Sequence, residues 1–118
     1  MKTDEFLCCA DELIEGQFSE RRFQSEGEIR YLVVTRHRGV AKAWLNVCPH
    51  QGRPLNWAPD RFLSDDQGNL VCAAHGAVFE CDQGRCISGP CKNANLRAVA
   101  IEESDGQVRI LPDRTLSA

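Results

Sequence analysis

Residues 48–76 read CPHQGRPLNWAPDRFLSDDQGNLVCAAHG and contain two short motifs of similar design. The first is Cys48-Pro49-His50 and the second is Cys72-Ala73-Ala74-His75, so each motif supplies one thiol and one imidazole. Both spacings keep the two side chains of a motif close together on an extended or tightly turning backbone. The sequence therefore predicts one metal centre with the ligands Cys48, His50, Cys72 and His75.

The pattern of ligands by itself leaves three interpretations open. Two cysteines on one iron and two histidines on the other hold one known type of 2Fe–2S cluster, which transfers single electrons. Two cysteines and two histidines also form structural zinc sites, but zinc fingers usually group like ligands, whereas each motif here is mixed. Chance is the third interpretation, because the chain has seven cysteines. The mixed motifs favour the iron–sulfur cluster.

Residues next to the motifs fit loops that hold a cluster. Pro49 stiffens the first motif by fixing φ. Gly52 and Gly76 follow the two motifs and allow the backbone to approach a cluster closely. Amide N–H groups in such loops donate to the sulfides and adjust the reduction potential.

Short β-rich segments separated by turns surround the motifs, and they predict an all-β fold. The expected strands are residues 29–36, 40–47, 70–71, 77–81, 85–87, 96–102 and 107–111. Arg38-Gly39 and Asp105-Gly106 are typical hairpin turns. In residues 40–47, Ala43 and Leu45 share one face and Trp44 lies on the other. Residues 56–69 are expected to form a surface excursion or a small hairpin. We expect a small antiparallel β-sandwich or barrel with both metal loops at one end.

Length and composition limit the possible functions. A chain of 118 residues fits a single domain, residues 1–118, whose cluster-binding part covers about 46–92. The net charge is −3, without the basic face of a nucleic-acid-binding protein. No apolar run reaches the roughly 20 residues of a membrane span, and the acidic N-terminus does not fit a signal peptide. We expect a soluble cytoplasmic protein without membrane or nucleic-acid partners.

The two motifs, extended to Cys48-Pro49-His50-Gln51-Gly52 and Cys72-Ala73-Ala74-His75-Gly76, resemble the ligand boxes of the Rieske family. Residues 88–90, Ser-Gly-Pro, are similar to the family's third loop, which covers the cluster. The resemblance spans about residues 28–111. It implies one Rieske-type 2Fe–2S cluster per chain, with Cys48 and Cys72 on one iron and His50 and His75 on the other. It also implies that Gly52, Gly76, Gly89, Pro49 and Pro90 support the cluster loops.

The function implied by this resemblance is that of a stand-alone Rieske-type ferredoxin, not an enzyme. Such a carrier takes one electron from a reductase and delivers it to an oxygenase or another redox enzyme, without a small-molecule substrate of its own. One alternative is a small subunit of a nitrite-reductase-like complex. Another is a structural or regulatory module with a Cys₂His₂ zinc site. A complete oxygenase fits poorly, because its second iron needs two more histidines and only His37 remains.

Departures from the family pattern lead to two further expectations. Where respiratory members of the family have a serine and a tyrosine that donate hydrogen bonds to sulfur, this chain has Ala77 and Phe79. Fewer donors make reduction less favourable, so we expect a potential near the low end of the Rieske range, about −150 mV. Cys86 and Cys91 flank the Gly89-Pro90 turn, where a disulfide is one possibility and two reduced thiols are the other. Trp44 and Trp57 are expected to be packing residues.

Overall fold

The computed structural model describes residues 5–25, 27–49, 52–74 and 76–111. In chain order the elements are β1 (Glu5–Cys9), the short 3₁₀ helix η1 (Ala10–Glu12), β2 (Ser19–Ser25), β3 (Glu28–His37), β4 (Val40–Leu45), β5 (Leu63–Ser64), β6 (Leu70–Val71), β7 (Val78–Phe79), β8 (Cys86–Ser88), β9 (Ile101–Ser104) and β10 (Gln107–Ile110). They form three antiparallel sheets with the orders β1-β10-β9, β2-β3-β4 and β5-β6-β7-β8. The predicted all-β antiparallel fold is confirmed.

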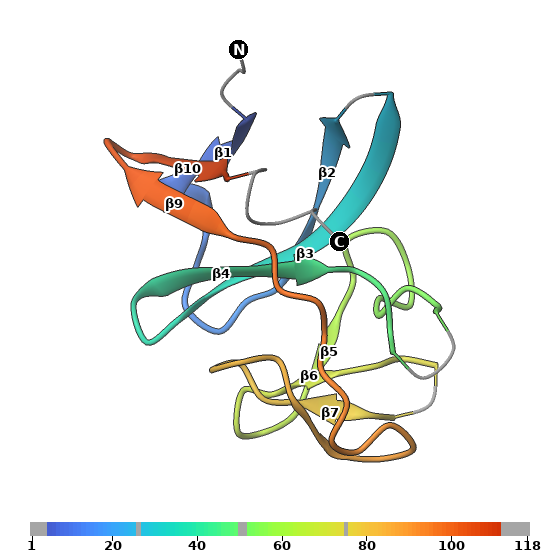
Figure 1. The fold of residues 1–118 in the computed structure, drawn as a ribbon. Helices are drawn as coiled ribbons and strands as arrows, with labels where there is room; N and C mark the ends of the chain where they lie inside the picture. Colours follow the sequence, from blue (N-terminus) through green and yellow to red (C-terminus); the bar gives the residue numbers. More distant parts are fainter. Residues whose placement is uncertain (1–4, 26, 50–51, 75, 112–118) are drawn as a thin grey trace.

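The sheet β2-β3-β4 lies between the other two sheets (Figure 1). Strands β3 and β4 are joined by Arg38 and Gly39, both with positive φ (54° and 79°), as the predicted hairpin turn requires. In their register Val33 pairs with Trp44, and the pairs on either side are Leu32–Leu45 and Val34–Ala43. Because side chains alternate along a strand, these neighbouring pairs point to opposite faces.

At these three pairs both faces of the central sheet are buried. Val33 and Trp44 belong to a lower core, whose other buried residues are Cys48, Leu55, Leu70, Cys72, Ala77, Phe79, Cys81, Cys86, Cys91 and Leu96. The pairs Leu32–Leu45 and Val34–Ala43 belong to an upper core, together with Leu7, Cys8, Leu13, Phe23, Val99, Val108 and Ile110. Strands β3 and β4 therefore form a partition between two apolar layers.

The upper sheet closes the side of the molecule away from the two motifs. Its hairpin turn is Asp105-Gly106, as predicted, and β1 pairs with β10. The strand that we expected over residues 96–102 begins only at Ile101. Residues 96–99 instead bond to two other parts of the chain: Leu96 N–H donates to the Gly84 carbonyl at 2.8 Å and Val99 N–H donates to the Ala43 carbonyl at 2.9 Å.

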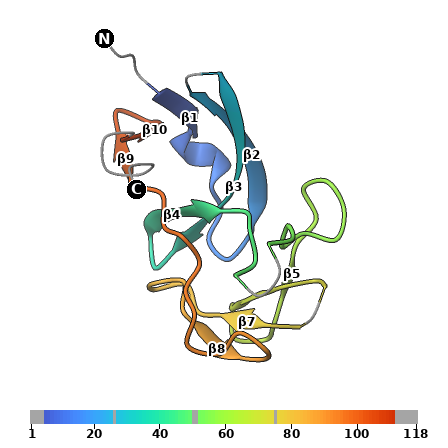
Figure 2. The same ribbon diagram turned by 45° about the vertical axis from the view of Figure 1, so that its right-hand side comes forward.

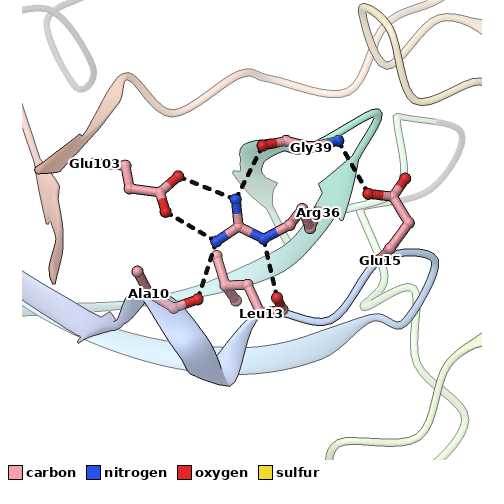
Figure 3. Close-up of polar contacts among 6 residues, drawn as sticks. All are labelled: Ala10, Leu13, Glu15, Arg36, Gly39 and Glu103. Carbon is pink, nitrogen blue, oxygen red and sulfur yellow. Dashed lines mark hydrogen bonds and ion pairs between the residues drawn. The ribbon is translucent and has the colours of Figure 1, made fainter. Parts of the chain in front are cut away.

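Arg36, near the end of β3, connects the central sheet to the upper one (Figure 3). Its guanidinium donates to both carboxylate oxygens of Glu103 in β9, at 3.1 and 3.0 Å. The same group donates to the carbonyls of Ala10, Leu13 and Gly39. A planar guanidinium with five N–H donors can satisfy all these acceptors at once, which a lysine cannot do.

The lower sheet consists of strands β5 to β8 (Figure 2). Cys72 directly follows its strand β6, whereas Cys48 follows β4 of the central sheet. Strands β5 and β6 form a small hairpin, closed by an Asp65 carboxylate that accepts from the N–H groups of Gln67 and Asn69. Only β5 lies within residues 56–69, where we expected a surface excursion or a small hairpin, and β6 is the strand predicted separately over residues 70–71. Strands β7 and β8 follow β6 in the sheet. Among the described residues, no helix is long and apolar enough to cross a membrane.

Candidate metal centre

The first motif begins at Cys48, after β4, and the described residues around it, Cys48, Pro49, Gly52 and Arg53, form the base of a loop. The N–H of Cys48 donates to the Arg53 carbonyl at 2.7 Å, and the N–H of Gly52 donates back to the Cys48 carbonyl at 2.8 Å. Gly52 has a φ of +72°, which glycine adopts without strain. The loop is therefore closed at its base by two backbone bonds, with Cys48 as its first residue.

The second motif begins at Cys72, after β6, and the described residues around it form the base of a second loop with the same arrangement of backbone bonds. The N–H of Cys72 donates to the Ala77 carbonyl at 2.7 Å, and the N–H of Gly76 donates to the Cys72 carbonyl at 2.9 Å. Gly76 has a φ of +75°, nearly that of Gly52. Each motif thus starts at the cysteine that closes its own loop.

The two loops pack against each other through the chain that follows the first. Ala73 N–H donates to the Leu55 carbonyl at 3.0 Å, and Leu55 is fully buried. Cys48 and Cys72 are each 1 % exposed and belong to the same lower core. The structure therefore brings the two predicted cysteine ligands into one buried region at the bases of two adjoining loops.

Asn46 orients this region, and its role was missed at the level of the sequence. It is 4 % exposed, and its Oδ1 accepts from Leu55 N–H at 2.8 Å while its Nδ2 donates to Asn56 at 2.9 Å. A buried amide needs such partners, since an unpaired one would cost about 1–3 kcal/mol. The only sequence signal was an asparagine at the end of an apolar strand, two residues before Cys48.

The predicted histidine ligands, His50 and His75, lie outside the described residues, as does Gln51. Within the described ranges, no three His, Cys, Asp or Glu side chains come together as a metal site. The donor set still fits the expected group, because two buried thiol sulfurs at the bases of adjoining loops suit iron or another thiophilic metal. The assignment of Cys48, His50, Cys72 and His75 as ligands stays a prediction.

A third loop packs against the second at Gly89. A Cβ atom at this position would lie 2.8 Å from the Cα of Ala77, and the φ of Gly89 is +102°. Only glycine fits both the conformation and the close contact. The turn continues through Pro90 to Cys91, and Lys92 N–H donates to the Gly89 carbonyl at 3.2 Å.

Three cysteines near the third loop are not disulfide-bonded. The sulfur atoms of Cys86 and Cys91 lie 3.3 Å apart as two thiols, which is the second of the two states we considered. Burial, followed by the neighbouring Cys86, raises the pKa of Cys91. Burial also raises the pKa of Cys81 to about 11, and its thiol donates to the Gly68 carbonyl. With these raised pKa values, Cys81 and Cys91 are protonated thiols at neutral pH.

The two tryptophans differ, and the expectation for Trp57 was wrong. Trp44 is buried, and its indole packs directly on Gly84, where a Cβ would lie 2.5 Å from Nε1. Trp57 is 60 % exposed. It lies along a groove of ≈ 270 Å³ that passes between the two motif loops and is lined by Arg53, Pro54, Asn56, Trp57, Ala73 and Ala74.

His37, the third histidine of the sequence, makes a contact at the surface. His37 Nε2 lies 2.9 Å from the Asp82 carboxylate, which belongs to the turn between β7 and β8. Lys42 donates to the carbonyl of the same residue at 3.1 Å. These contacts connect the β3–β4 turn to the lower sheet.

Comparison with protein families gives one match over most of the chain. The family model for the Rieske [2Fe-2S] domain matches residues 5–112. The oxygenase subunit of vanillate O-demethylase from a Pseudomonas species is 35 % identical over 86 residues, which are 69 % of this chain. The chain spans only about a quarter (24 %) of the length of that relative.

Solved structures with the same fold include both carriers and oxygenases. The ferredoxin of carbazole 1,9a-dioxygenase from Nocardioides aromaticivorans IC177 has a TM-score of 0.69 at 19 % identity, covering 92 % of this chain and 97 % of the ferredoxin. A carbazole-bound oxygenase and ferredoxin complex of carbazole 1,9a-dioxygenase gives a TM-score of 0.71 at 17 % identity, with 92 % and 27 % covered. At these identities the similarity shows the fold alone.

Proposed function

Because this chain belongs to the Rieske [2Fe-2S] domain family, we propose that it is a one-electron carrier of the ferredoxin type. It carries a Rieske-type 2Fe–2S cluster, as the family does. In the proposed role it accepts an electron from a reductase and passes it to an oxygenase or another redox enzyme. The similar ferredoxin is covered over 97 % of its length, whereas the oxygenase relative is covered over about a quarter.

The observation that carries this proposal is the pair of loops with matching backbone bonds, each beginning at a buried cysteine. We assign Cys48 and Cys72 to one iron and His50 and His75 to the other. Pro49, Gly52, Gly76, Gly89 and Pro90 shape the loops around them. Together these residues lie within the part of the chain, about 46–92, that we propose binds the cluster.

The bound cluster supplies reversible one-electron chemistry. With two thiolates and two neutral imidazoles its charge is zero when oxidised and −1 when reduced, which makes it easier to reduce than a four-cysteine cluster. The chain's own residues exclude water from the cysteine side, where Leu55, Ala77 and Phe79 are fully buried. Low local polarity and the backbone amides of the loops then adjust the potential.

A second candidate is supported by the oxygenase relative. In that case these residues are the Rieske part of a multicomponent oxygenase, and the catalytic iron is bound elsewhere. The chain's three histidines do not provide the two extra ligands of such an iron once His50 and His75 are assigned. A small subunit of a nitrite-reductase-like complex stays a further alternative, and family membership favours the cluster over a zinc site.

The test measures cluster content and redox behaviour of the purified protein. We expect equal amounts of iron and acid-labile sulfide, an EPR signal after dithionite reduction, and uptake of one electron per chain in an anaerobic titration. The reduced protein should also lose its electron to the oxygenase of a Rieske dioxygenase system in stopped-flow experiments. Oxygen consumption with an aromatic substrate by this chain together with a subunit that binds the catalytic iron, without a separate oxygenase, would instead support the oxygenase candidate.

Cysteine variants test the ligand assignment. Cys48→Ser and Cys72→Ser should lose the EPR signal and at least most of the iron. Cys8→Ala is the matched control, because Cys8 is also buried but belongs to the upper core. Retention of a normal signal by either serine variant would contradict the assignment, as would a colourless wild-type protein that contains zinc.

A further inference from the structure

Cys86 and Cys91 form a close pair of thiols in the lower core, beside the third loop. Their sulfur atoms lie 3.3 Å apart, and Cys91 donates its S–H to Cys86. Cys86 in turn donates its S–H to the Ser88 carbonyl at 3.2 Å. The sulfurs of a disulfide are about 2.0 Å apart, so this pair has to close by roughly 1.3 Å to form one. Side-chain rotation covers such a distance where the backbone already holds the two residues together.

Backbone bonds hold the two cysteines together through Ala94. Cys86 N–H donates to the Ala94 carbonyl at 2.7 Å, and Ala94 N–H donates to the Cys91 carbonyl at 2.8 Å. Asn93 N–H closes the same turn by donating to the Cys86 carbonyl at 2.9 Å. Because folding has already brought the two thiols together, joining them costs little further loop-closure entropy.

A second pair of cysteines shows that closeness in the sequence is not enough. Cys8 and Cys9 are adjacent in β1, where successive side chains point to opposite faces of the sheet. Cys8 is buried and Cys9 is exposed. The meeting of Cys86 and Cys91 is therefore a product of the turn that follows β8.

The two thiols of the close pair differ in their access to water. Cys91 is 8 % exposed, whereas Cys86 is fully buried. A small oxidant in solution therefore reaches Cys91 first, and the sulfur within reach of Cys86 is that of Cys91. This is the arrangement of an attacking thiol with a resolving thiol beside it.

We propose that Cys86 and Cys91 are a modification site, which low-molecular-weight disulfides such as oxidised glutathione convert reversibly into an internal disulfide. The Cys91 sulfur attacks one sulfur of oxidised glutathione, which breaks the glutathione S–S bond and releases one molecule of reduced glutathione. The Cys86 sulfur then attacks the Cys91 sulfur, forms the internal S–S bond and releases the second glutathione. The two cysteines are oxidised, and their two electrons and two protons leave on the two glutathione thiols.

The internal disulfide joins β8 to the far end of the third loop. The same loop packs at Gly89 against Ala77, next to the second motif. Oxidation should therefore restrain this loop and slow the loss of iron to a chelator. This consequence rests on the proposed function, whereas the modification itself does not depend on the cluster.

The test treats the cluster-loaded protein with oxidised glutathione until the extent of modification is constant, because buried thiols react slowly. Free thiols are then blocked and the protein is digested with trypsin. Cleavage after Arg85 and Lys92 yields the peptide 86–92, which contains both cysteines of the pair and no other cysteine. We expect most copies of this peptide to be lighter by two hydrogens and to have no free thiol. Dithiothreitol should restore both thiols.

The tryptic peptide 3–21, which contains Cys8 and Cys9, is the internal control. The exposed Cys9 should carry a bound glutathione, and this peptide should not form an internal disulfide. A peptide 86–92 that stays a dithiol while Cys9 is modified would overturn the inference. A disulfide that joins peptide 86–92 to the peptide with Cys48 would overturn it as well.

Two serine variants test the order of the steps. In Cys86→Ser the second step is blocked, so Cys91 should retain one glutathione. In Cys91→Ser the buried Cys86 should stay a free thiol. The reverse pattern would contradict the assigned roles, and the wild-type peptide decides the inference if a variant does not fold.

Iron release to a chelator, followed by visible absorption after the reagents are removed, tests the consequence for the loop. Release should be several-fold slower from the oxidised wild-type protein than from the dithiothreitol-treated one. The same treatments should leave the rate unchanged in Cys91→Ser, which cannot form the disulfide. Equal rates in the two wild-type states would overturn the effect on the loop. A protein without a cluster would overturn the proposed function, and peptide 86–92 would still decide the modification.

Discussion

At Gly89 the third loop packs closely against Ala77, next to the second motif. The Gly89 φ of +102° and the contact with Ala77 are separate constraints, since one concerns the backbone and the other concerns space. Gly68 offers a comparison, because it has a φ of +82° but a Cβ atom added there would meet no other atom within 4 Å. The two glycines allow strain and crowding to be measured separately.

We expect Gly68→Ala to lower the free energy of unfolding by about 1 kcal/mol, because an L-residue is disfavoured in this conformation. Gly89→Ala should cost at least about 2 kcal/mol more, because the new methyl group crowds backbone atoms of residue 77. Urea unfolding of the cluster-loaded proteins measures both values. Equal losses of unfolding free energy in the two variants would show that the crowding at Gly89 does not affect stability.

Among single residues, the sequence indicated the cysteines and glycines of the loops, because the spacing of a motif is a local signal. The sequence did not indicate a role for Asn46. This role depends on hydrogen bonds with Leu55 and Asn56, which only the fold brings close to the Asn46 side chain. Trp57 was also misjudged: a large apolar residue is usually buried, but this one lies on the rim of a groove.

Among the elements, β3, η1 and β9 meet at the Arg36 guanidinium (Figure 3). The hydrogen bond from Arg36 holds the pKa of Glu103 below its usual value of 4.5. A carboxylate with a lowered pKa stabilises the fold above its usual pKa, and the contribution is lost as the pH falls through the folded-state value. This contact between sheets therefore weakens in acid.

We expect Glu103→Gln to reduce stability at pH 7, with a difference from wild type that shrinks as the pH falls below about 4.5. Urea unfolding of the cluster-loaded proteins between pH 7 and pH 3 measures the difference in unfolding free energy between wild type and variant. Effects of acid on the cluster are common to both proteins and cancel in this difference. Glu102→Gln, on the neighbouring exposed residue of β9, is the control for loss of a charge. A difference that stays constant with pH would mean that the ionised pair does not stabilise the fold.

Hairpins with a glycine turn were the elements best predicted from sequence, because the turn residues carry the signal locally. Strand β2 was missed, since Ser19–Ser25 has no apolar alternation and only Phe23 of its described side chains is buried. Its place is determined by pairing with β3 along its whole length. Residues 96–100, which the sequence predicts as part of a strand, lie outside β9. The N–H groups of Leu96 and Val99 instead donate to the carbonyls of Gly84 and Ala43.

For the whole molecule, the partition formed by β3 and β4 separates the loops from the upper sheet. Val33 and Val34 are adjacent, are both fully buried, and point to different cores. The sequence shows a run of apolar residues here but not that the run faces two separate layers, because the layers are formed by strands far apart in the chain. The all-β fold class and the position of the loops at one end agree with the prediction from the sequence. The division of the core into two layers could not be predicted from the sequence.

Val33→Ala and Val34→Ala should each lower the free energy of unfolding by about 2–3 kcal/mol, since each leaves a small cavity. Only Val33→Ala should also speed the loss of iron to a chelator under native conditions, because its cavity lies in the core that contains Cys48 and Cys72. Visible absorption follows the release. Equal release rates in the two variants would indicate that the layers respond as one unit.

The bonds that close the two ligand loops join main-chain groups of the protein to one another. Their geometry is thus specified by the polypeptide, and the entropy of ordering the loops is lost during folding. Loop bases ordered in this way would need little rearrangement when the proposed cluster binds, and little again when it gains or loses an electron. Small structural change on reduction keeps the reorganisation energy low, which is the property that allows fast exchange between proteins that meet only briefly.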